Sequence, residues 1–387
     1  MKLVSKSLGD SIKNALVVSF GPTNRQENGY YKHVHSLKEI LNESLEVESI
    51  EFTDYECNKQ TKVGSLYIGT KNNVLYKGLK ISIYALVLAN KIKSADVIFI
   101  EGSFFIPFAI ISYIFGKKIV FESHGFISVI AIRYKGSVID RLVRRIFGFG
   151  IDKITSILSD LTLVTSEADK AFAIDFLKIN KKKVMIRSVI IEHGSGSING
   201  VFTKDLRAKF GVTKDQLMAI FVGDLLSIQN KTALEFIIAN ETSIPNNVRL
   251  IIVGRGFQNF AYYSDKILFT GFVDNIEDIY EAADLLLAPL TTGTGIKTKI
   301  IEAFAHGLTV VTTLVGIEGI DYGHCNGVFV FEKENFFLNF KKIAKFNLKG
   351  IKHQCLRDIY LEKYSIKVLR KEVENILVKL SRGSDLK

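Results

Sequence analysis

The chain has 387 residues, more than a single hydrophobic core usually covers, so two domains are expected. Hydrophobic residues make up 47% of the sequence and charged residues 24%, which excludes a mostly disordered chain. The net charge of +11 indicates an anionic partner, which is a membrane surface, a nucleic acid or a phosphorylated substrate.

The cysteines and the apolar segments suggest where the protein resides. Cys57, Cys325 and Cys355 are widely spaced and form no CxxC pattern, so they predict neither a disulfide framework nor a zinc site. We therefore expect a cytoplasmic protein. The first 20 residues lack the features of a signal peptide. The longest apolar stretch, residues 104–115, is too short to span a bilayer, so any membrane contact is expected to be peripheral.

Residues 1–191 alternate between strand patterns and helix patterns. Strands are predicted at residues 15–20, 45–52, 95–102, 117–125 and 161–166, and residues 183–191 close this half. Helices are predicted at residues 31–41, 74–93, 104–115 and 167–177, and residues 53–73 are predicted to form a loop. The alternation predicts a Rossmann-like domain with a parallel sheet and right-handed crossovers.

Residues 132–153 combine basic and apolar side chains. The basic residues are Arg133, Lys135, Arg141, Arg144, Arg145 and Lys153. Two interpretations stay open: a helix with arginines on a solvated face, or a helix attracted to the surface of an anionic membrane.

Residues 192–204 are rich in Gly, Ser and Asn and predict an interdomain linker. The strand and helix alternation then resumes over residues 205–363. Strands are predicted at residues 218–224, 248–254, 266–273, 282–288, 308–313 and 327–332. Residues 361–380 read as one long helix, and the segment 364–387 is expected to pack back on the N-terminal domain. The fold class is therefore α/β, with two Rossmann-like domains that face a cleft.

The segment 289–307, PLTTGTGIKTKIIEAFAHG, joins a buried strand, a glycine-rich turn and a helix. Gly293 and Gly295 allow positive φ, and the helix that follows directs its N-terminal N–H groups at the turn. A P-loop is excluded because Ile296, not lysine, follows Gly295. A purely structural turn and a nucleotide-diphosphate site both remain open on these residues alone.

At this point the second half resembles a known family. The segments FVGDLLSIQNKTALEFI, RLIIVGRG and ILFTGFVDNIEDIYEAADLLLAPLTTGTGIKTKIIEAFAHGLTVVTT look like the C-terminal domain of the family 4 retaining glycosyltransferases. The resemblance implies the GT-B fold and transfer of a hexose-type sugar from a nucleotide-sugar, a UDP-sugar being favoured. It also implies no cofactor and no metal, and the sequence offers no DxD pair or histidine cluster for a catalytic cation.

The resemblance also implies roles for residues of the donor loop. Glu302 falls on the glutamate that bonds the donor ribose, and the backbone at Gly295 and Ile296 falls where the diphosphate is held. Lys297 and Lys299 would balance the charge of the leaving group. The candidate catalytic residues are His124, Lys297 and Glu302.

This sequence departs from the family pattern at several positions. Thr294 stands where a first glutamate is usual, and Asp224 and Gln229 stand where Arg and Lys are usual. Lys231 is a shifted candidate for the missing cation, and Arg255 is another candidate phosphate partner. Further donor-binding candidates are Gly21, Gly29, Gly223 and Thr294, and a glycine in such loops is equally an ordinary turn residue. His124 ends the predicted strand at residues 117–125, where it is either a structural residue or a contact of the donor sugar.

The acceptor is expected to be a saccharide or a lipid-linked saccharide of the bacterial cell envelope, handled at the inner face of the plasma membrane. Two other functions remain open: a non-catalytic partner of another glycosyltransferase, and a sugar-nucleotide epimerase. A nucleic-acid partner is disfavoured because no base-stacking motif accompanies the positive charge.

Overall fold

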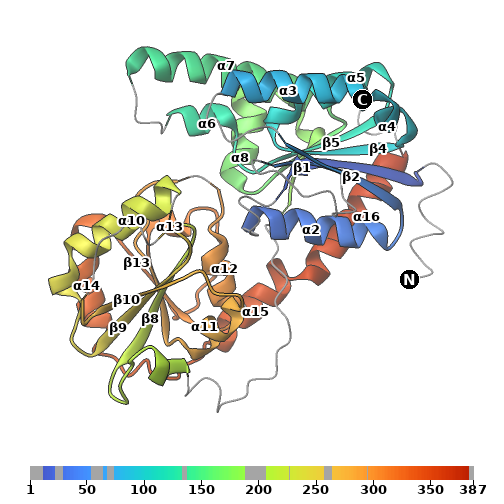
Figure 1. Ribbon diagram of the computed structural model, residues 1–387. Coiled ribbons are helices and arrows are strands. Elements are labelled where there is room, and N and C mark those ends of the chain that lie inside the picture. Colours follow the sequence, from blue (N-terminus) through green and yellow to red (C-terminus); the bar gives the residue numbers. More distant parts are fainter. Residues whose placement is uncertain are drawn as a thin grey trace. The chain divides into compact units, whose positions relative to one another are not determined.

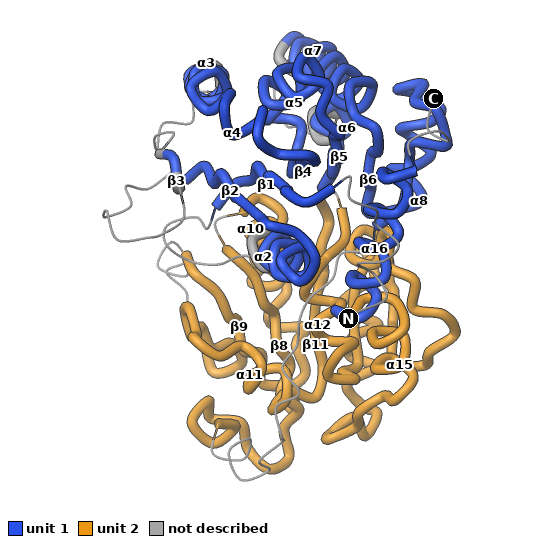
Figure 2. The backbone as a smooth tube through the Cα atoms, turned by 90° about the vertical axis from the view of Figure 1, so that its right-hand side faces the viewer, with its two compact units in different colours: residues 1–190, 366–387 blue, residues 191–365 orange. Residues whose placement is uncertain are grey.

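The structure is a computed structural model, and it describes residues 12–21, 29–53, 64–67, 74–132, 137–187, 206–225, 227–256, 264–293 and 295–382. The chain forms two compact units (Figures 1 and 2). Unit 1 comprises residues 1–190 and 366–387, and unit 2 comprises residues 191–365. The predicted linker at residues 192–204 lies outside the described residues.

Unit 1 is built around a parallel sheet of seven described strands in the order β3-β2-β1-β4-β5-β6-β7. The strands are β1 Asn14–Phe20, β2 Glu46–Thr53, β3 Gly64–Tyr67, β4 Val97–Glu101, β5 Lys118–Ser123, β6 Leu161–Val164 and β7 Val184–Ile186. The helices are α2 Gly29–Asn42, α3 Val74–Val87, α4 Ala89–Ser94, α5 Ile106–Ile114, α6 Ile127–Ile132, α7 Val138–Leu158, α8 Glu167–Ala171 and α16 Ile366–Arg382. Ser166 caps α8, and its side chain accepts from the backbone N–H of Asp169.

Helices cover both faces of this sheet. On one face, Phe105 and Phe108, which precede and lie in α5, pack with Phe52 of β2 in an apolar cluster. On the other face, Leu37 of α2 and Leu369 of α16 share a cluster with strand residues. Both faces of the strands are therefore apolar, which explains why β4 and β5 read as continuous hydrophobic runs.

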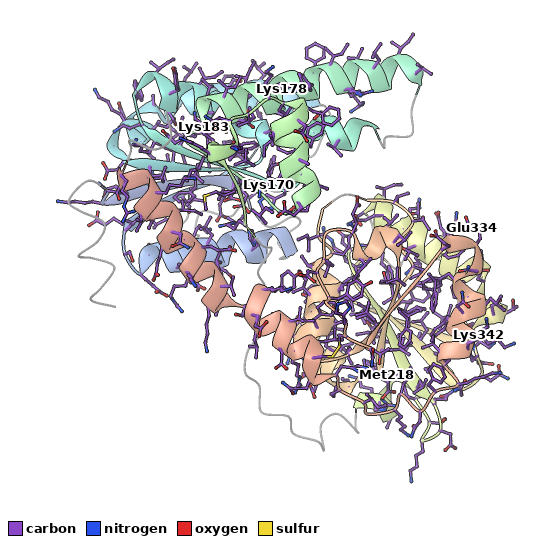
Figure 3. All side chains as sticks on the ribbon, turned by 180° about the vertical axis from the view of Figure 1, so that it is seen from behind. Lys170, Lys178, Lys183, Met218, Glu334 and Lys342 are labelled. Carbon is purple, nitrogen blue, oxygen red and sulfur yellow. A yellow bond between two sulfur atoms is a disulfide. The ribbon has the colours of Figure 1, made fainter. Side chains whose placement is uncertain are left out.

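Unit 2 contains a parallel sheet of six described strands in the order β10-β9-β8-β11-β12-β13. The strands are β8 Leu217–Val222, β9 Val248–Val253, β10 Ile267–Gly271, β11 Leu285–Ala288, β12 Thr309–Thr313 and β13 Val328–Phe331. The helices are α10 Ile228–Ala239, α11 Ile276–Ala282, α12 Thr298–Ala305, α13 Leu314–Ile317, α14 Phe336–Ile343 and α15 Gln354–Lys363. Met218 of β8 is fully buried and Lys342 of α14 lies at the surface, as the labelled side chains show (Figure 3).

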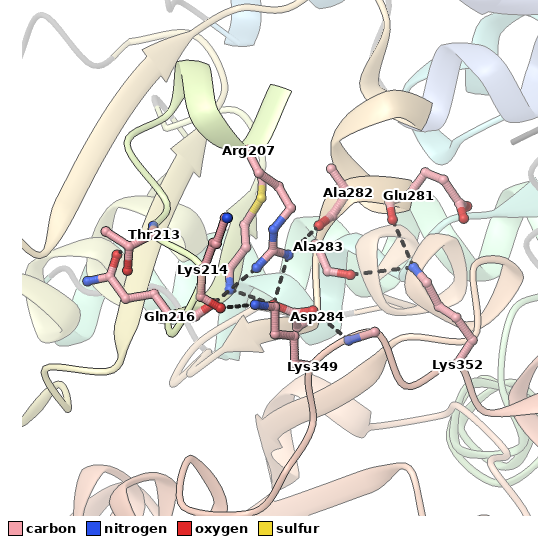
Figure 4. Close-up of polar contacts among 12 residues, drawn as sticks. Arg207, Thr213, Lys214, Gln216, Glu281, Ala282, Ala283, Asp284, Lys349 and Lys352 are labelled. Atoms are coloured by element: carbon pink, nitrogen blue, oxygen red, sulfur yellow. Dashed lines mark hydrogen bonds and ion pairs between the residues drawn. The ribbon is translucent and has the colours of Figure 1, made fainter. Parts of the chain in front are cut away.

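A partly buried ion pair between Arg207 and Asp284 lies at the amino ends of β8 and β11 (Figure 4). The Asp284 carboxylate accepts from the Arg207 guanidinium at 2.9 Å and from the backbone N–H of Met218 at 2.7 Å. Its second oxygen accepts from the N–H of Gly350 at 2.9 Å. This network leaves the opposite, carboxyl edge of the sheet to the loops that sequence reasoning assigns to a ligand.

Three expectations from the sequence are wrong. Cys325 and Cys355 form a disulfide, because the fold brings their Cα atoms to 5.9 Å although 30 residues separate them. Residues 64–67, predicted as loop, pair with β2 as an edge strand. The single helix predicted at residues 361–380 is two helices, because α15 ends at Lys363 where the chain leaves unit 2 and α16 begins in unit 1.

Candidate functional site

The candidate donor site lies at the carboxyl edge of the unit 2 sheet. Strand order reverses between β8 and β11, and loops that leave neighbouring strands in opposite directions open a crevice for a ligand at such a point. The loop after β8 carries Gly223 and Asp224, and the loop after β11 leads into α12. The sequence analysis named candidate residues in both loops.

The loop between β11 and α12 has the predicted backbone. Gly293 and Gly295 have φ values of +116° and +71°, a region that L side chains rarely adopt. A Cβ atom on Gly293 would lie 2.2 Å from Oε1 of Gln229, so this glycine also permits close packing against α10. Helix α12 begins at Thr298, directly after Lys297. Thr294 lies outside the described residues.

Lys299 is a buried cation at the centre of this region. Its Nζ donates to Oδ1 of Asn230 at 2.6 Å and lies 4.4 Å from the centroid of the Phe221 ring. The pKa of Lys299 is lowered to about 7, chiefly by burial; the Glu302 carboxylate opposes the shift and the Lys297 charge adds to it. A Cβ atom on Gly223 would lie 3.0 Å from this amine, so a side chain at that position would crowd it. The amine is therefore enclosed by α10 and the end of β8.

Glu302 is held by a tyrosine from the preceding helix. Its Oε2 accepts from the hydroxyl of Tyr280 at 2.7 Å, and Glu302 as a residue is only 8% exposed. Burial, followed by the Glu302 charge, raises the pKa of Tyr280 well above its ordinary value, which keeps this hydroxyl a donor. The carboxylate is therefore oriented before any ligand binds.

The remaining candidates of unit 2 have varied surroundings. Lys297 is buried and its Nζ donates to the carbonyl of Gly295, within the loop itself. The Arg255 guanidinium donates to Oδ2 of Asp224 at 2.5 Å. Ile296 is half-buried in the loop, whereas Lys231 is exposed on α10. Of the cations, only Lys297 and Lys299 are buried at the loop that leads into α12.

In unit 1, His124 follows β5 at the carboxyl edge of the sheet. Its Nε2 donates to Oε2 of Glu101, the last residue of β4, at 2.8 Å. Burial opposes the charged imidazole, but the hydrogen bond to Glu101 and the Glu122 charge outweigh it and raise the pKa of His124. His124 is therefore a partly exposed proton donor above a buried carboxylate.

Beside it lies a buried ionic network formed by Glu122, Arg187 and His33. Glu122 Oε1 lies 2.9 Å from Nε2 of His33, and the Arg187 guanidinium contacts both of these residues. Although burial opposes ionisation of Glu122, the charges of Arg187 and His33 hold its pKa well below the ordinary value. Burial and the Arg187 charge lower the pKa of His33. The network therefore presents an ionised carboxylate clamped by a guanidinium.

The expectation that the chain has no histidine cluster is wrong, because the fold brings two histidines and a glutamate together. Ligand atoms of His33, Glu122 and His124 lie within 4.8 Å of one another, a spacing that a metal ion could use. However, the guanidinium of Arg187 already contacts two of these three groups. A second cation there would be repelled at short range, so this donor set does not fit a metal.

The two candidate glycines of unit 1, Gly21 and Gly29, lie just after β1 and at the start of α2. A Cβ atom on Gly21 would lie 2.9 Å from Cγ2 of Thr53, so close packing on β2 by itself explains this glycine. Gly29 is the first residue of α2. Residues 22–28 between them lie outside the described part of the chain.

Sequence reasoning missed Asn230, Tyr280, Glu101, Glu122 and Arg187. A usable signal existed for two of them, because Glu101 and Glu122 each end an otherwise apolar strand pattern. Charged residues at the carboxyl ends of adjacent parallel strands meet at one edge of the sheet. Asn230, Tyr280 and Arg187 gave no comparable pattern, since their partners lie 69, 22 and 154 residues away in the sequence.

Two parallel α/β units of this kind define the GT-B fold, and solved structures agree. HepE from Anabaena, solved in complex with UDP and glucose, has a TM-score of 0.72 at 13% identity, covering 95% of this chain and 99% of its own. WaaG, a glycosyltransferase involved in lipopolysaccharide biosynthesis, has a TM-score of 0.71 at 16% identity, covering 94% and 99%. Sucrose-phosphate synthase from Thermosynechococcus elongatus has a TM-score of 0.68 at 14% identity, covering 96% and 100%. The predicted fold class is confirmed.

A more particular match concerns unit 2. Residues 216–342 match the protein family described as Glycosyl transferases group 1. This range contains Lys299, Glu302, Asn230 and the loop between β11 and α12. The comparison with curated proteins gave no match.

Proposed function

We propose that this protein is a retaining glycosyltransferase that takes a hexose-type sugar from a nucleotide-sugar, with UDP-sugars as the favoured donors. The observation that carries the proposal is the buried amine of Lys299, placed between the loops after β8 and β11 at the reversal of strand order. A buried cation beside a helix N-terminus suits a diphosphate. The match to Glycosyl transferases group 1 covers these residues, and the structural neighbour HepE was solved with UDP-glucose.

We propose a role for each of the donor residues. The backbone of Gly295 and Ile296 and the N-terminus of α12 would hold the diphosphate, with Lys297 and Lys299 supplying positive charge. Glu302, oriented by Tyr280, would accept hydrogen bonds from ribose hydroxyls. Lys299 would also replace the cations usual after the first strand of this domain, because its amine lies at Asn230 and Gly223 in that region.

In the proposed reaction the bond between the anomeric carbon and the diphosphate oxygen breaks, and a bond to the acceptor oxygen forms on the same face. The departing phosphate oxygen takes the proton of the acceptor hydroxyl, which balances the charge. Lys299 and the helix terminus stabilise the negative charge that develops on the diphosphate. His124 would contact the transferred sugar, where an imidazole N–H can donate a hydrogen bond to a hydroxyl oxygen. No cofactor or metal takes part in this scheme.

For the acceptor we propose a saccharide or lipid-linked saccharide of the bacterial cell envelope, handled in the cytoplasm at the inner face of the plasma membrane. No helix among the described residues is long and apolar enough to cross a membrane. The disulfide between Cys325 and Cys355 removes the argument for a reducing compartment that the cysteine spacing gave. The proposed location therefore rests on the nucleotide-sugar donor.

The proposal is tested by incubating the protein with a panel of nucleotide-sugars and following binding by native mass spectrometry and release of nucleoside diphosphate. The anomeric configuration of the product is then read by NMR. Retained configuration is expected, and an inverted product would refute the mechanism. Binding of nucleotide-sugars without turnover on any acceptor would instead favour a non-catalytic partner subunit, an alternative that the departures from the family pattern at Thr294 and Asp224 favour.

The affinity for UDP is expected to fall as pH rises from 7 to 9. The pKa of Lys299 is about 7 in the free protein, and an adjacent diphosphate raises it, so binding takes up a proton in this range. The diphosphate is fully ionised there, because its last pKa is about 6. Calorimetry in two buffers of different ionisation enthalpy measures both the affinity and the proton uptake.

The affinity for UDP is expected to fall by up to about tenfold per pH unit, which is the limit when binding takes up one proton. Lys299→Met should bind UDP more weakly and show no proton uptake above pH 7. The matched control is Lys342→Met, a change of an exposed lysine on α14 that should keep both properties. An unchanged pH dependence in Lys299→Met would contradict the assignment.

A further inference from the structure

Helix α7 of unit 1 is oriented with its apolar side outward. Its buried positions are Gly148 and the polar residues Asp152, Thr155 and Ser156. Asp152 accepts from the hydroxyl of Ser103 and from the hydroxyl and N–H of Ser128, at 2.7 to 2.9 Å. These bonds fix the inward face of the helix, so its apolar face is left toward solvent.

The exposed apolar side chains of α7 form a stripe at helical spacing. They are Val138, Ile139, Leu142, Val143, Ile146, Phe147, Phe149, Ile154 and Ile157. Ile139, Ile146 and Phe147 are 76%, 63% and 68% exposed. At 100° per residue these positions fall on one side of the helix, with Arg144 and Arg145 at its two borders.

Helices α3 and α5 expose apolar side chains as well. On α3 these are Tyr76, Leu79, Ile83, Leu86 and Val87, and at the end of α5 they are Ile110, Tyr113, Ile114 and Phe115. Helix α5 contacts both α3 and α7, and the three helices lie side by side on the same face of the sheet in both views (Figures 1 and 2). We call this set of exposed residues the three-helix surface. An apolar area spread over three helices marks an interaction site.

The charged side chains described on the three-helix surface are of one sign. Helices α3 and α5 contain no Asp or Glu. Helix α7 contains Asp152, which is buried, and Asp140, whose side chain lies outside the described part of the chain. Lys77 and Lys80 lie on α3, and Arg144, Arg145 and Lys153 on α7. The Nζ of Lys80 lies 4.9 Å from the ring of Tyr76, and that of Lys153 lies 5.7 Å from Phe149. Such lysines extend along apolar neighbours and leave the charge at their border.

We propose that the three-helix surface docks on the surface of an anionic lipid bilayer. Its apolar side chains enter the boundary between headgroups and acyl chains, and the flanking arginines and lysines meet anionic headgroups. The charge complementarity selects this occupant over a second copy of the chain, whose identical basic surface would repel it. The inference decides between the two interpretations left open for residues 132–153, and it does not depend on the proposed activity.

Co-sedimentation with vesicles tests the proposal. Wild-type protein is expected to bind vesicles of phosphatidylcholine with about one quarter phosphatidylglycerol, and to bind pure phosphatidylcholine vesicles much more weakly. The variant Ile139→Ser/Ile146→Ser/Phe147→Ser should lower the partition coefficient at least about tenfold, because each exposed side chain loses apolar burial in the bilayer. The matched control is Leu338→Ser/Phe346→Ser/Leu361→Ser, which changes equally exposed residues of unit 2.

A second variant tests the electrostatic part. Arg144→Gln/Arg145→Gln should lower binding to the anionic vesicles about 25-fold, at about fivefold per charge, and leave binding to neutral vesicles unchanged. Lys341→Gln/Lys342→Gln on α14 is the control. Thermal unfolding and UDP binding of every variant should match the wild type, since the changed side chains are exposed.

Three results would overturn the inference. The first is a wild-type protein that binds neither kind of vesicle. The second is serine variants that bind as well as the wild type. The third is a concentration-dependent dimer, seen by sedimentation velocity without vesicles, in a protein that binds no vesicles. If the same serine substitutions dissociate that dimer, the three-helix surface joins two copies of the chain.

Discussion

Glu302→Ala is expected to lower kcat/KM for the nucleotide-sugar donor about 100-fold. The carboxylate would lose hydrogen bonds to ribose hydroxyls, and a hydrogen bond to a charged group contributes about 1.5–3 kcal/mol. Glu302 is 8% exposed and its Oε2 already accepts from Tyr280, so no neighbouring group can replace the carboxylate without rearrangement. Steady-state kinetics, together with the Kd for UDP from calorimetry, measure the effect.

Two companion measurements separate ribose recognition from folding. Glu302→Gln keeps an acceptor for the buried Tyr280 hydroxyl, so it should fold as the wild type and still bind the donor about tenfold more weakly. The wild-type protein should prefer UDP over its 2′- or 3′-deoxy analogue, and Glu302→Ala should lose that preference. A variant that still discriminates between them, or that turns over at the wild-type rate, would refute the ribose role.

Glu122→Gln is expected to lower the free energy of unfolding of unit 1 by about 3–5 kcal/mol. Glu122 and Arg187 are almost fully buried, and removing one partner of a buried ion pair leaves the other charge uncompensated. The loss is aggravated because Nε and Nη1 of Arg187 have no hydrogen-bond partner in the described part of the chain. Hydrogen exchange of β5 and β6 measures unit 1 without assuming that both units unfold together.

The same carboxylate sets an acid limit to stability. The pKa of Glu122 is lowered on folding from an ordinary value of 4.5, so its contribution is complete above about pH 4.5 and is lost as pH falls toward the folded pKa. Protection of unit 1 should therefore fall in acid more steeply in the wild type than in Glu122→Gln. The control is Glu167→Gln, which alters an exposed pair with Lys170 and should change stability by less than about 0.5 kcal/mol. Equal stability of the Glu122 and Glu167 variants would show that the network is not a stabilising one.

Much of the fold could be predicted because the spacing of apolar residues and the positions of glycines are local properties of the sequence. Strand β11 and the loop after it were recognisable from the apolar run before Pro289 and from Gly293 and Gly295, whose φ values are positive as expected. Gly307, which ends the same segment, also has a positive φ, +63°, where α12 ends. Each of these features depends on residues within one turn or strand.

The partners of the site residues could not be predicted in this way. Lys299 and Asn230 are 69 positions apart, and Arg187 and His33 are 154 apart, so no spacing in the sequence links them. The disulfide between Cys325 and Cys355 was missed for the same reason. The outward apolar face of α7 was also hidden, because an amphipathic pattern does not say which side of a helix faces the core.

The sequence by itself determined that two parallel α/β domains follow one another and that a glycine-rich turn precedes the helix carrying Lys297, Lys299 and Glu302. These features could be predicted because backbone propensity and the spacing of apolar residues depend on only a few neighbouring residues. Only the tertiary structure decided that Lys299 lies at Asn230, that Tyr280 holds Glu302, and that Arg187 clamps Glu122. Hydrogen bonds and pKa shifts act over a few ångströms, and it is the strand order that determines which distant residues come within that distance.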